Sequence, residues 1–152
     1  MTGASERRQT AIVACVNAQG DVLLVRQRSG PFAGAWLLPG GGVDDDEEPE
    51  DAARREMREE TGCELDALMH VATYQVDERT QEFRALVHLY RAAAIGSPRP
   101  EDGSAVRWSR PDARGYHPAL RRELADAGLR LEDDTALDAA LRATNVAMRR
   151  LA

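Results

Sequence analysis

Three glutamates near the middle of the chain have a spacing that suits metal binding. Glu56, Glu59 and Glu60 stand at positions i, i+3 and i+4, so in a helix they share one face. Three carboxylates on one face repel one another and destabilise a helix, whereas Mg²⁺ and Mn²⁺ prefer oxygen ligands of this kind. We expect no lysine or arginine on that face. The alternative is a solvated helix face, which for Glu59 and Glu60 taken alone is the more common arrangement.

The segment around these glutamates follows a longer pattern. Residues 41–63, from Gly41 to Cys63, read GGVDDDEEPEDAARREMREETGC and match G-x5-E-x7-R-E-U-x-E-E-x-G-U, where U is an apolar residue. This segment resembles the Nudix box, and the WLLPGGG run before it is similar to the sequence that usually leads into the box. Asp46 and Glu48 replace the glycine and the serine or threonine often found there, at positions that the motif leaves free. The chain is therefore identified as similar to the Nudix hydrolase family.

The resemblance implies how the acidic stripe is used. Glu56, Glu59 and Glu60 would hold divalent metal ions, Mg²⁺ or Mn²⁺, and the carbonyl group of Gly40 would be a further ligand. The activity implied is the hydrolysis of a diphosphate linkage, in which metal ions offset phosphate charge and a carboxylate takes a proton from water. We favour Glu56 over Glu59 as that base.

The resemblance also assigns the remaining box positions. Arg55 would pair with Glu47 and fix the loop against the helix. Gly41 and Gly42 would permit the tight backbone that leads into the helix, and Gly62 would end it.

Two acids beyond the box are further candidates. Glu101 and Asp102 lie in a loop and would supply the base or another metal ligand, because in the family the base sometimes comes from a loop after the box. The alternative of two solvated loop acids is equally common.

Candidate substrate contacts are spread along the chain. Arg26 and Arg28 point to one side of an expected strand and would reach phosphate, although a solvated strand face is the more common arrangement. Arg84 and Gly41 are further candidates, and Trp36 would either stack on a base or pack in the core. The other aromatic candidates for a base-stacking wall are Phe32 and Tyr74.

The type of substrate is less constrained than the reaction. The stretch at residues 77–81 has neither the tyrosine of dinucleoside polyphosphate hydrolases nor the proline of one ADP-ribose type. We therefore favour a nucleoside triphosphate or dNTP pyrophosphatase, with an ADP-ribose or nucleotide-sugar pyrophosphatase as the alternative. The alternative to an enzyme is a non-catalytic nucleotide-sensing module, and the intact box acids count against it.

Composition limits the partners. The 152 residues carry a formal net charge of −6, which disfavours nucleic acid or an anionic membrane as a partner but is compatible with a small phosphorylated ligand. All basic residues are arginines, so Schiff-base and P-loop lysine chemistry are excluded. We see no signal peptide or membrane span and expect a cytoplasmic protein. Cys15 and Cys63 are expected to be buried and unpaired.

The predicted elements give an α/β (α+β) protein in a single domain, residues 1–152. Strands are expected over residues 11–16, 21–27, 36–38, 68–76, 82–93 and 105–109, and helices over 49–61, 118–127 and 135–151. The resemblance implies the Nudix fold: a mixed sheet sandwiched between helices, with the box as a loop–helix–loop. The last helix would pack on the core or on another subunit of a homodimer, and core packing is favoured.

Overall fold

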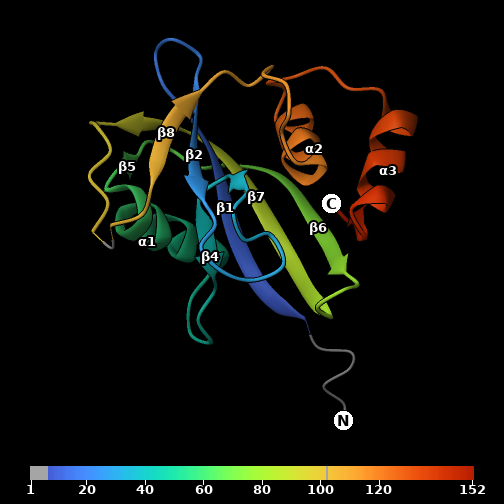
Figure 1. Ribbon diagram of the computed structural model, residues 1–152. Coiled ribbons are helices and arrows are strands. Elements are labelled where there is room, and N and C mark those ends of the chain that lie inside the picture. The colour runs from blue at the N-terminus through green and yellow to red at the C-terminus, as the bar shows by residue number, and fades with distance from the viewer. Residues whose placement is uncertain (1–6, 102) are drawn as a thin grey trace.

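Figure 1 shows the computed structural model, which describes residues 7–101 and 103–152. In chain order, its elements are β1 (Arg8–Val16), β2 (Val22–Arg26), β3 (Trp36–Leu37), β4 (Gly40–Gly42), α1 (Pro49–Thr61), β5 (Glu64–Leu65), β6 (Met69–Glu78), β7 (Phe83–Ile95), β8 (Val106–Ser109), α2 (Pro118–Asp126), α3 (Asp134–Ala143) and β9 (Val146–Arg150).

The strands of the described residues join into one mixed sheet. Its main path runs β3-β2-β1-β7-β6-β9, while β4 pairs with β1, β5 with β7 and β8 with β2. Only β1 and β7, among these pairs, run parallel. In Figure 1, α1 lies on one side of the sheet and α2 and α3 lie on the other. The predicted sandwich of a mixed sheet between helices is confirmed.

Each face of the sheet carries its own apolar cluster, because successive strand residues point to opposite faces. Ala11, Val13 and Cys15 of β1 pack on the α1 side with Ala53 and Met57. On the other face, Ala14 of β1 and Leu24 of β2 pack against the two C-terminal helices, whose buried leucines are Leu120, Leu124, Leu137 and Leu141. Cys15 and Cys63 are buried and free, as expected.

The helix α1 begins and ends where the sequence predicts. Pro49 occupies its first turn, where a missing N–H costs nothing. Gly62 ends it in the left-handed conformation, with φ of 72°, and its N–H donates to the carbonyl groups of Arg58 and Met57. A Cβ at Gly62 would lie 1.9 Å from the carbonyl oxygen of Arg99, so the following loop requires glycine there.

The expected helix over residues 135–151 is wrong in its second half. Helix α3 ends at Ala143, and Asn145 adopts a φ of 62°, a conformation that Asn tolerates better than most residues. The chain then forms β9, which pairs antiparallel with β6 from Tyr74↔Arg150 to Glu78↔Val146. The spacing of leucine and alanine predicts a helix and does not show that β6 would otherwise be an edge strand. Its unpaired backbone N–H and C=O groups form hydrogen bonds with this segment, which therefore becomes a strand.

None of the helices in the described part of the chain is long and apolar enough to cross a membrane.

Candidate active site

The strand β4 and the helix α1 lie against each other. β4 pairs with β1 in the register Ile12↔Gly40. A Cβ at Gly40, where φ is 154°, would lie 2.1 Å from the carbonyl oxygen of Ala11, so only glycine fits. The Gly40 N–H donates to Oε1 of Glu60 over 2.7 Å, which ties the strand to the end of the helix.

Gly41 lets the carboxyl group of Glu56 rest directly on the backbone. A Cβ added at Gly41 would lie 2.5 Å from Cδ of Glu56 and 2.6 Å from its Oε1. Such contacts are far inside van der Waals distance, so a side chain at this position would displace the carboxyl group. Burial raises the pKa of Glu56, an effect that a hydrogen bond from Arg55 partly opposes.

Arg55 joins the loop before the helix to the glutamates. Its Nε and Nη2 donate to the two carboxyl oxygens of Glu47 over 2.8 and 2.9 Å, and Nη2 also donates to the carbonyl oxygen of Gly42 over 2.9 Å. The structure thus places Arg55 against Glu47, as the resemblance implies. These hydrogen bonds, together with one from the backbone N–H of Asp44, lower the pKa of Glu47 to about 2.

The expectation that no arginine shares the acidic face is wrong. Nη1 of Arg55 donates to Oε1 of Glu56 over 2.9 Å and lies 3.5 Å from Oε2 of Glu59. The fork of the guanidinium group reaches from the loop to both glutamates, so one cation offsets part of their mutual repulsion. The helix positions alone did not show this, because the long Arg55 side chain turns back towards the stripe.

The donor set suits a hard divalent cation. Glu56, Glu59 and Glu60 offer carboxylate oxygens, and no thiolate or imidazole lies among them. Over residues 7–101 and 103–152, however, no three acidic, histidine or cysteine side chains are grouped closely enough to hold a metal ion. One oxygen of each of two carboxyl groups is already engaged, since Oε1 of Glu60 accepts a hydrogen bond from Gly40 and Oε1 of Glu56 accepts one from Arg55.

The loop after β7 returns to the end of α1. The N–H of Glu101 donates to the carbonyl oxygen of Glu59 over 2.9 Å, and the N–H of Arg99 donates to that of Thr61 over 2.5 Å. The backbone of the exposed Glu101 therefore lies beside the end of α1, and a role for its carboxyl group stays a prediction. The other loop candidate, Asp102, lies outside the described residues.

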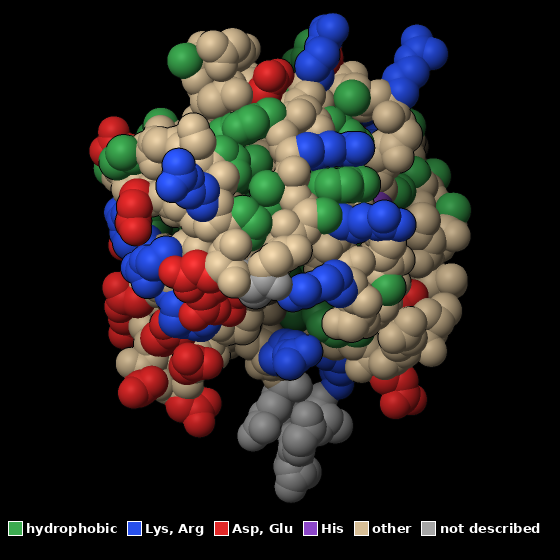
Figure 2. Space-filling view, turned by 60° about the vertical axis from the view of Figure 1, so that its left-hand side comes forward, with side chains coloured by type: hydrophobic (Ala, Val, Ile, Leu, Met, Phe, Trp, Pro, Cys, Tyr) green, Lys and Arg blue, Asp and Glu red, His purple; other side chains and the backbone are tan. Residues whose placement is uncertain are grey.

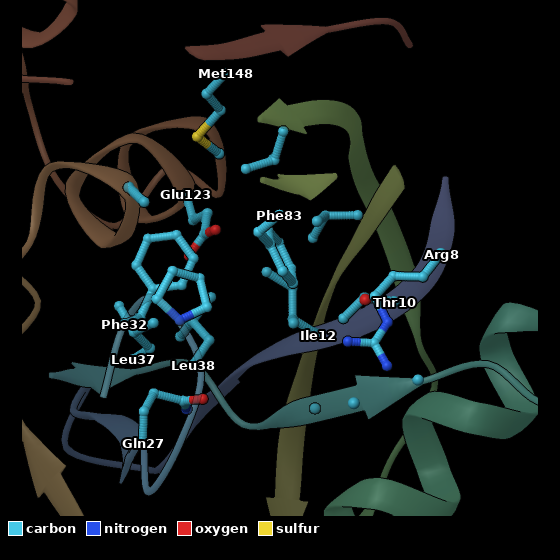
Figure 3. A pocket seen from close by; sticks show the side chains of 18 of the residues that line it. Arg8, Thr10, Ile12, Gln27, Phe32, Leu37, Leu38, Phe83, Glu123 and Met148 are labelled. Atoms are coloured by element: carbon cyan, nitrogen blue, oxygen red, sulfur yellow. The ribbon is translucent and has the colours of Figure 1, made fainter. Parts of the chain in front are cut away.

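A cavity of about 310 Å³ opens on the other side of β4. Figure 3 shows Phe32, Leu37, Leu38 and Phe83 around it, with Arg8 and Thr10 at one end and Glu123 and Met148 on the side of α2. Its lining also includes Gly40, Gly41 and Gly42. Gly40 and Gly41 are thus shared, because they touch glutamates of α1 and also border the cavity, whereas Gly42 borders the cavity and bonds to Arg55.

Most of the predicted substrate contacts lie elsewhere. Gly41 borders the cavity, but Arg26, Arg28, Trp36 and Arg84 are not among its described lining residues. Trp36 is half-buried, and the guanidinium group of Arg107 covers its ring at 4.1 Å from the centroid.

Two of these arginines are exposed at strand ends, outside the lining of the cavity. Arg84 is exposed at the start of β7 and lies 3.5 Å from Asp77. Arg26 is exposed at the end of β2, opposite Trp36. In Figure 2, acidic side chains gather on the left of the view together with several arginines, and further arginines lie between apolar groups on the right.

Of the two aromatic candidates for a base-stacking wall, one lines the cavity and the other does not. Phe32 does line the cavity, where it packs edge-on against Phe83 and His117 with ring centroids 6.0 and 5.2 Å apart. Tyr74 is buried in the core instead, and its hydroxyl group donates to Asp126 over 2.5 Å.

Sequence reasoning missed several lining residues. Arg8 and Gln27 gave no signal beyond their polarity. Glu123 did give one, because it lies between Leu120 and Leu124 on α2 and is only 8% exposed. An acid within an apolar helical stripe marks either an ion pair or a cavity.

The family model of the NUDIX domain matches residues 6–127. A putative 8-oxo-dGTP diphosphatase of Bacillus subtilis (strain 168) is 33% identical over 106 residues, which are 68% of this chain and 66% of the relative. The nucleoside triphosphatase NudI of Klebsiella pneumoniae (strain 342) is 38% identical over 77 residues, or 49% of this chain and 54% of that protein. The matched segments therefore span less than two thirds of these curated relatives.

A solved structure agrees with the family model. The MutT NUDIX hydrolase from Burkholderia pseudomallei superposes with a TM-score of 0.71 at 28% identity, covering 80% of this chain and 98% of that one. The box at residues 41–63 lies inside the matched region. By its sequence, its sheet and its loop–helix–loop segment, the chain belongs to the Nudix family.

Proposed function

We propose that this protein is a metal-dependent nucleoside triphosphate pyrophosphatase that acts on nucleotides or deoxynucleotides. One observation carries the proposal: the strand Gly40–Gly42 separates a face of glutamates from an apolar cavity. A nucleotide has the same two parts, a charged phosphate chain and a flat, largely apolar base. Bound across this strand, it would present its phosphates to Glu56, Glu59 and Glu60 while its base enters the cavity.

The size of the cavity supports a single nucleoside as the group bound. At about 310 Å³ it lies at the lower end of small-molecule sites, which span about 300–1,000 Å³. A dinucleotide would leave its second nucleoside outside. The names of the two curated relatives, an 8-oxo-dGTP diphosphatase and a nucleoside triphosphatase, support the same substrate class.

Nudix hydrolases generally use divalent metal ions, and we propose Mg²⁺ or Mn²⁺ here. The groups that would hold the ion are the carboxylates of Glu56, Glu59 and Glu60 and the carbonyl group of Gly40, with Glu101 as a further candidate. The bound ion supplies positive charge that offsets the phosphate oxygens and polarises the phosphorus–oxygen bond.

The chain's own residues supply the rest of the reaction. Glu56 takes a proton from the attacking water, since it is partly buried and fixed between Gly41 and Arg55. Arg55 orients Glu56, and Glu47 holds Arg55 in turn. The apolar walls around Phe32 exclude water from the base. The binding energy of the base, which is remote from the reacting bond, then helps to position the phosphates.

The proposal is tested by incubating the purified chain with Mg²⁺ or Mn²⁺ and separate substrates: nucleoside triphosphates, oxidised dNTPs, ADP-ribose and nucleotide sugars. We expect a nucleoside monophosphate and pyrophosphate from triphosphates, and no turnover after chelation of the metal. If ADP-ribose or a nucleotide sugar is cleaved in preference to triphosphates, the protein is an ADP-ribose or nucleotide-sugar pyrophosphatase instead. Nucleotide binding without any product would instead indicate a sensing module.

We also propose that residues 1–152 form a single domain, because α3 and β9 join the core and the sheet formed by the earlier elements. The cytoplasmic location and a homodimer stay predictions.

A further inference from the structure

Three exposed arginines lie around the tryptophan of β3. Arg26 of β2 stands opposite Trp36 in the strand register, and the guanidinium group of Arg107 of β8 covers the Trp36 ring. The segment before α2 adds Arg114 and Tyr116, which border a hollow of about 370 Å³ beside Arg107. We call these five residues the arginine surface. It is separate from the cavity that borders β4, because none of the five lines that cavity.

The charge of the arginine surface is not balanced within the chain. In the part of the chain that the structure describes, no ion pair or hydrogen bond joins a carboxyl group to Arg26, Arg107 or Arg114. The residues that line the hollow include no acid. The neighbouring Arg130 is in contrast paired with Glu132. Although the net charge of the chain is −6, this part of it is cationic and suits an anionic partner.

The chain carries the matching negative charge in residues 44–51, the acidic segment. Seven of these eight residues are acids, and all of the acids except Glu47 are exposed. Over the described residues no cation pairs with five of them, namely Asp45, Asp46, Glu48, Glu50 and Asp51. The segment is nevertheless ordered, because Glu47 is held by Arg55 and by the N–H of Asp44. Docking this segment on a partner therefore costs little conformational entropy.

We propose that the acidic segment of a second copy of this chain docks on the arginine surface. The exchange is reciprocal, so that two copies related by a two-fold axis form a closed dimer with two identical contacts. Figure 2 shows acids on its left and arginines between apolar groups on its right, so both kinds of charge can face one partner. Guanidinium groups bind carboxylates through paired hydrogen bonds, and the hollow beside Arg107 and Arg114 gives an acidic side chain room to enter.

The strength of this dimer is limited by its chemistry. Ion pairs between exposed side chains contribute little each and are screened by salt, and the net charge of −6 on each copy opposes association. We expect a Kd of roughly 100 µM at about 50 mM salt, and a Kd larger by roughly tenfold at about 0.5 M salt. A dimer held by apolar contacts would not weaken in this way.

The test is sedimentation of the purified chain between about 10 µM and about 300 µM, in low and in high salt. We expect monomer and dimer with no larger species, since reciprocal docking closes the assembly. Arg107→Glu with Arg114→Glu reverses one side of the contact, and Asp45→Arg with Asp46→Arg reverses the other. Each double variant should raise the Kd at least roughly tenfold, because like charges then meet in both contacts.

A mixture of the two double variants separates docking from loss of the fold. In the mixed dimer, the unchanged acids of one variant meet the unchanged arginines of the other, and the two reversed sets meet each other. Both contacts therefore join opposite charges again. We expect the mixture to form dimers with a Kd close to that of the natural chain, while each variant alone stays monomeric. A variant that did not fold could not be rescued by mixing.

Arg79→Glu with Arg142→Glu is the matched control for the reversed arginines. Both residues are exposed, lie outside the arginine surface and give the same change in net charge, so the Kd should rise by less than about threefold. The proposal is overturned by a chain that stays monomeric at about 300 µM in low salt, or by a dimer that salt or either reversal leaves intact. A mixture that does not associate, or a control that weakens the dimer as much as the reversal, also overturns it.

Discussion

The two sides of β4 are built in opposite ways. On one side, the glutamate face, defined as Glu56, Glu59 and Glu60 with Arg55, comes from six consecutive residues of one helix. The carboxylates of Glu56 and Glu60 are held there by hydrogen bonds. On the other side, the cavity draws on residues from Arg8 to Met148, and its wall is mainly apolar. Reaction chemistry is therefore encoded locally, whereas recognition depends on how distant segments fold together.

This difference also concerns tolerance to substitution. Residues of the glutamate face contact the residues around it: Glu60 bonds to Gly40, Glu56 rests on Gly41, and Arg55 bonds to Glu47. A single change there disturbs several hydrogen bonds at once. The cavity is bounded by separate side chains from different elements, so one change there alters the shape of the wall and leaves the rest in place. We expect losses in kcat on one side and changes in KM on the other.

The largest effect should follow Glu56→Gln. Glutamine fills the same space against Gly41 but cannot take a proton from water. We expect kcat to fall by about a thousandfold, the range for loss of a general base, while the binding of nucleoside monophosphate is retained. Steady-state kinetics with Mg²⁺ and calorimetry measure the two quantities.

Glu64→Gln, outside the glutamate face and exposed, is the control for Glu56→Gln and should keep full activity. If Glu56→Gln keeps substantial turnover, the base lies elsewhere, and Glu59→Gln and Glu101→Gln are the next variants. A large loss of nucleotide binding in Glu56→Gln would contradict the division of labour across β4.

Gly41→Ala should have the next largest effect. The added Cβ would lie 2.5 Å from Cδ of Glu56, so the carboxyl group must move off the backbone. A misplaced catalytic group costs about a hundredfold in kcat. Gly42→Ala is the matched variant, because its Cβ would meet nothing within 4 Å, and its loss should be much smaller. Equal activities in the two variants would show that contact between Gly41 and Glu56 does not matter.

The local side of β4 was largely predictable from sequence. Pro49, the spacing of the glutamates and Gly62 fix the helix at residues 49–61, because capping and helical periodicity act over a few residues. The link between Arg55 and Glu47 came from the resemblance and is present. The approach of Arg55 to Glu56 and Glu59 was not foreseen, since helix positions do not determine where a long side chain ends.

The cavity could not be predicted in the same way. Its residues come from β1, the loop after β2, β3, β4, β6, β7, α2 and β9, and whether they meet depends on how the strands pair in the sheet. Arg26 and Arg84 were chosen for their charge, yet both are exposed. The strand β9 was itself missed, because Asn145 and the free edge of β6 outweigh the helical spacing of residues 135–151. Because β9 was missed, the position of its residue Met148 in the wall of the cavity was not predicted either.

Phe32→Ala should separate recognition from chemistry. It removes an aromatic wall that packs on Phe83 and His117, so the base loses an apolar contact while Glu56 stays in place. We expect KM to rise about tenfold, in line with the loss of an aromatic contact, with kcat within about a factor of two. Kinetics over a range of substrate concentrations measure both constants.

Leu131→Ala, which changes a side chain that is 99% exposed, is the control for Phe32→Ala. Thermal unfolding of both variants shows whether the fold persists. A fall in kcat with unchanged KM after Phe32→Ala would mean that the cavity does not hold the base.

The smallest effect should come from Glu47→Gln, and it depends on pH. Hydrogen bonds from Arg55 lower the pKa of Glu47 from 4.5 to about 2, so its ionised form stabilises the folded chain. That stabilisation is complete above about pH 4.5 and is lost as the pH falls towards about 2. The natural chain should therefore have the higher Tm at neutral pH, by no more than about 4 °C because the pair is partly exposed. The difference in Tm between the natural chain and Glu47→Gln should narrow as the pH falls below 4.5.

Calorimetric unfolding at several pH values measures this difference in Tm. Asp138→Asn, which removes an acid of another partly exposed ion pair, is the comparison. A gap that is independent of pH would mean that the charge of Glu47 does not hold Arg55, and the glutamate face would then owe its order to the backbone of Gly40–Gly42 alone.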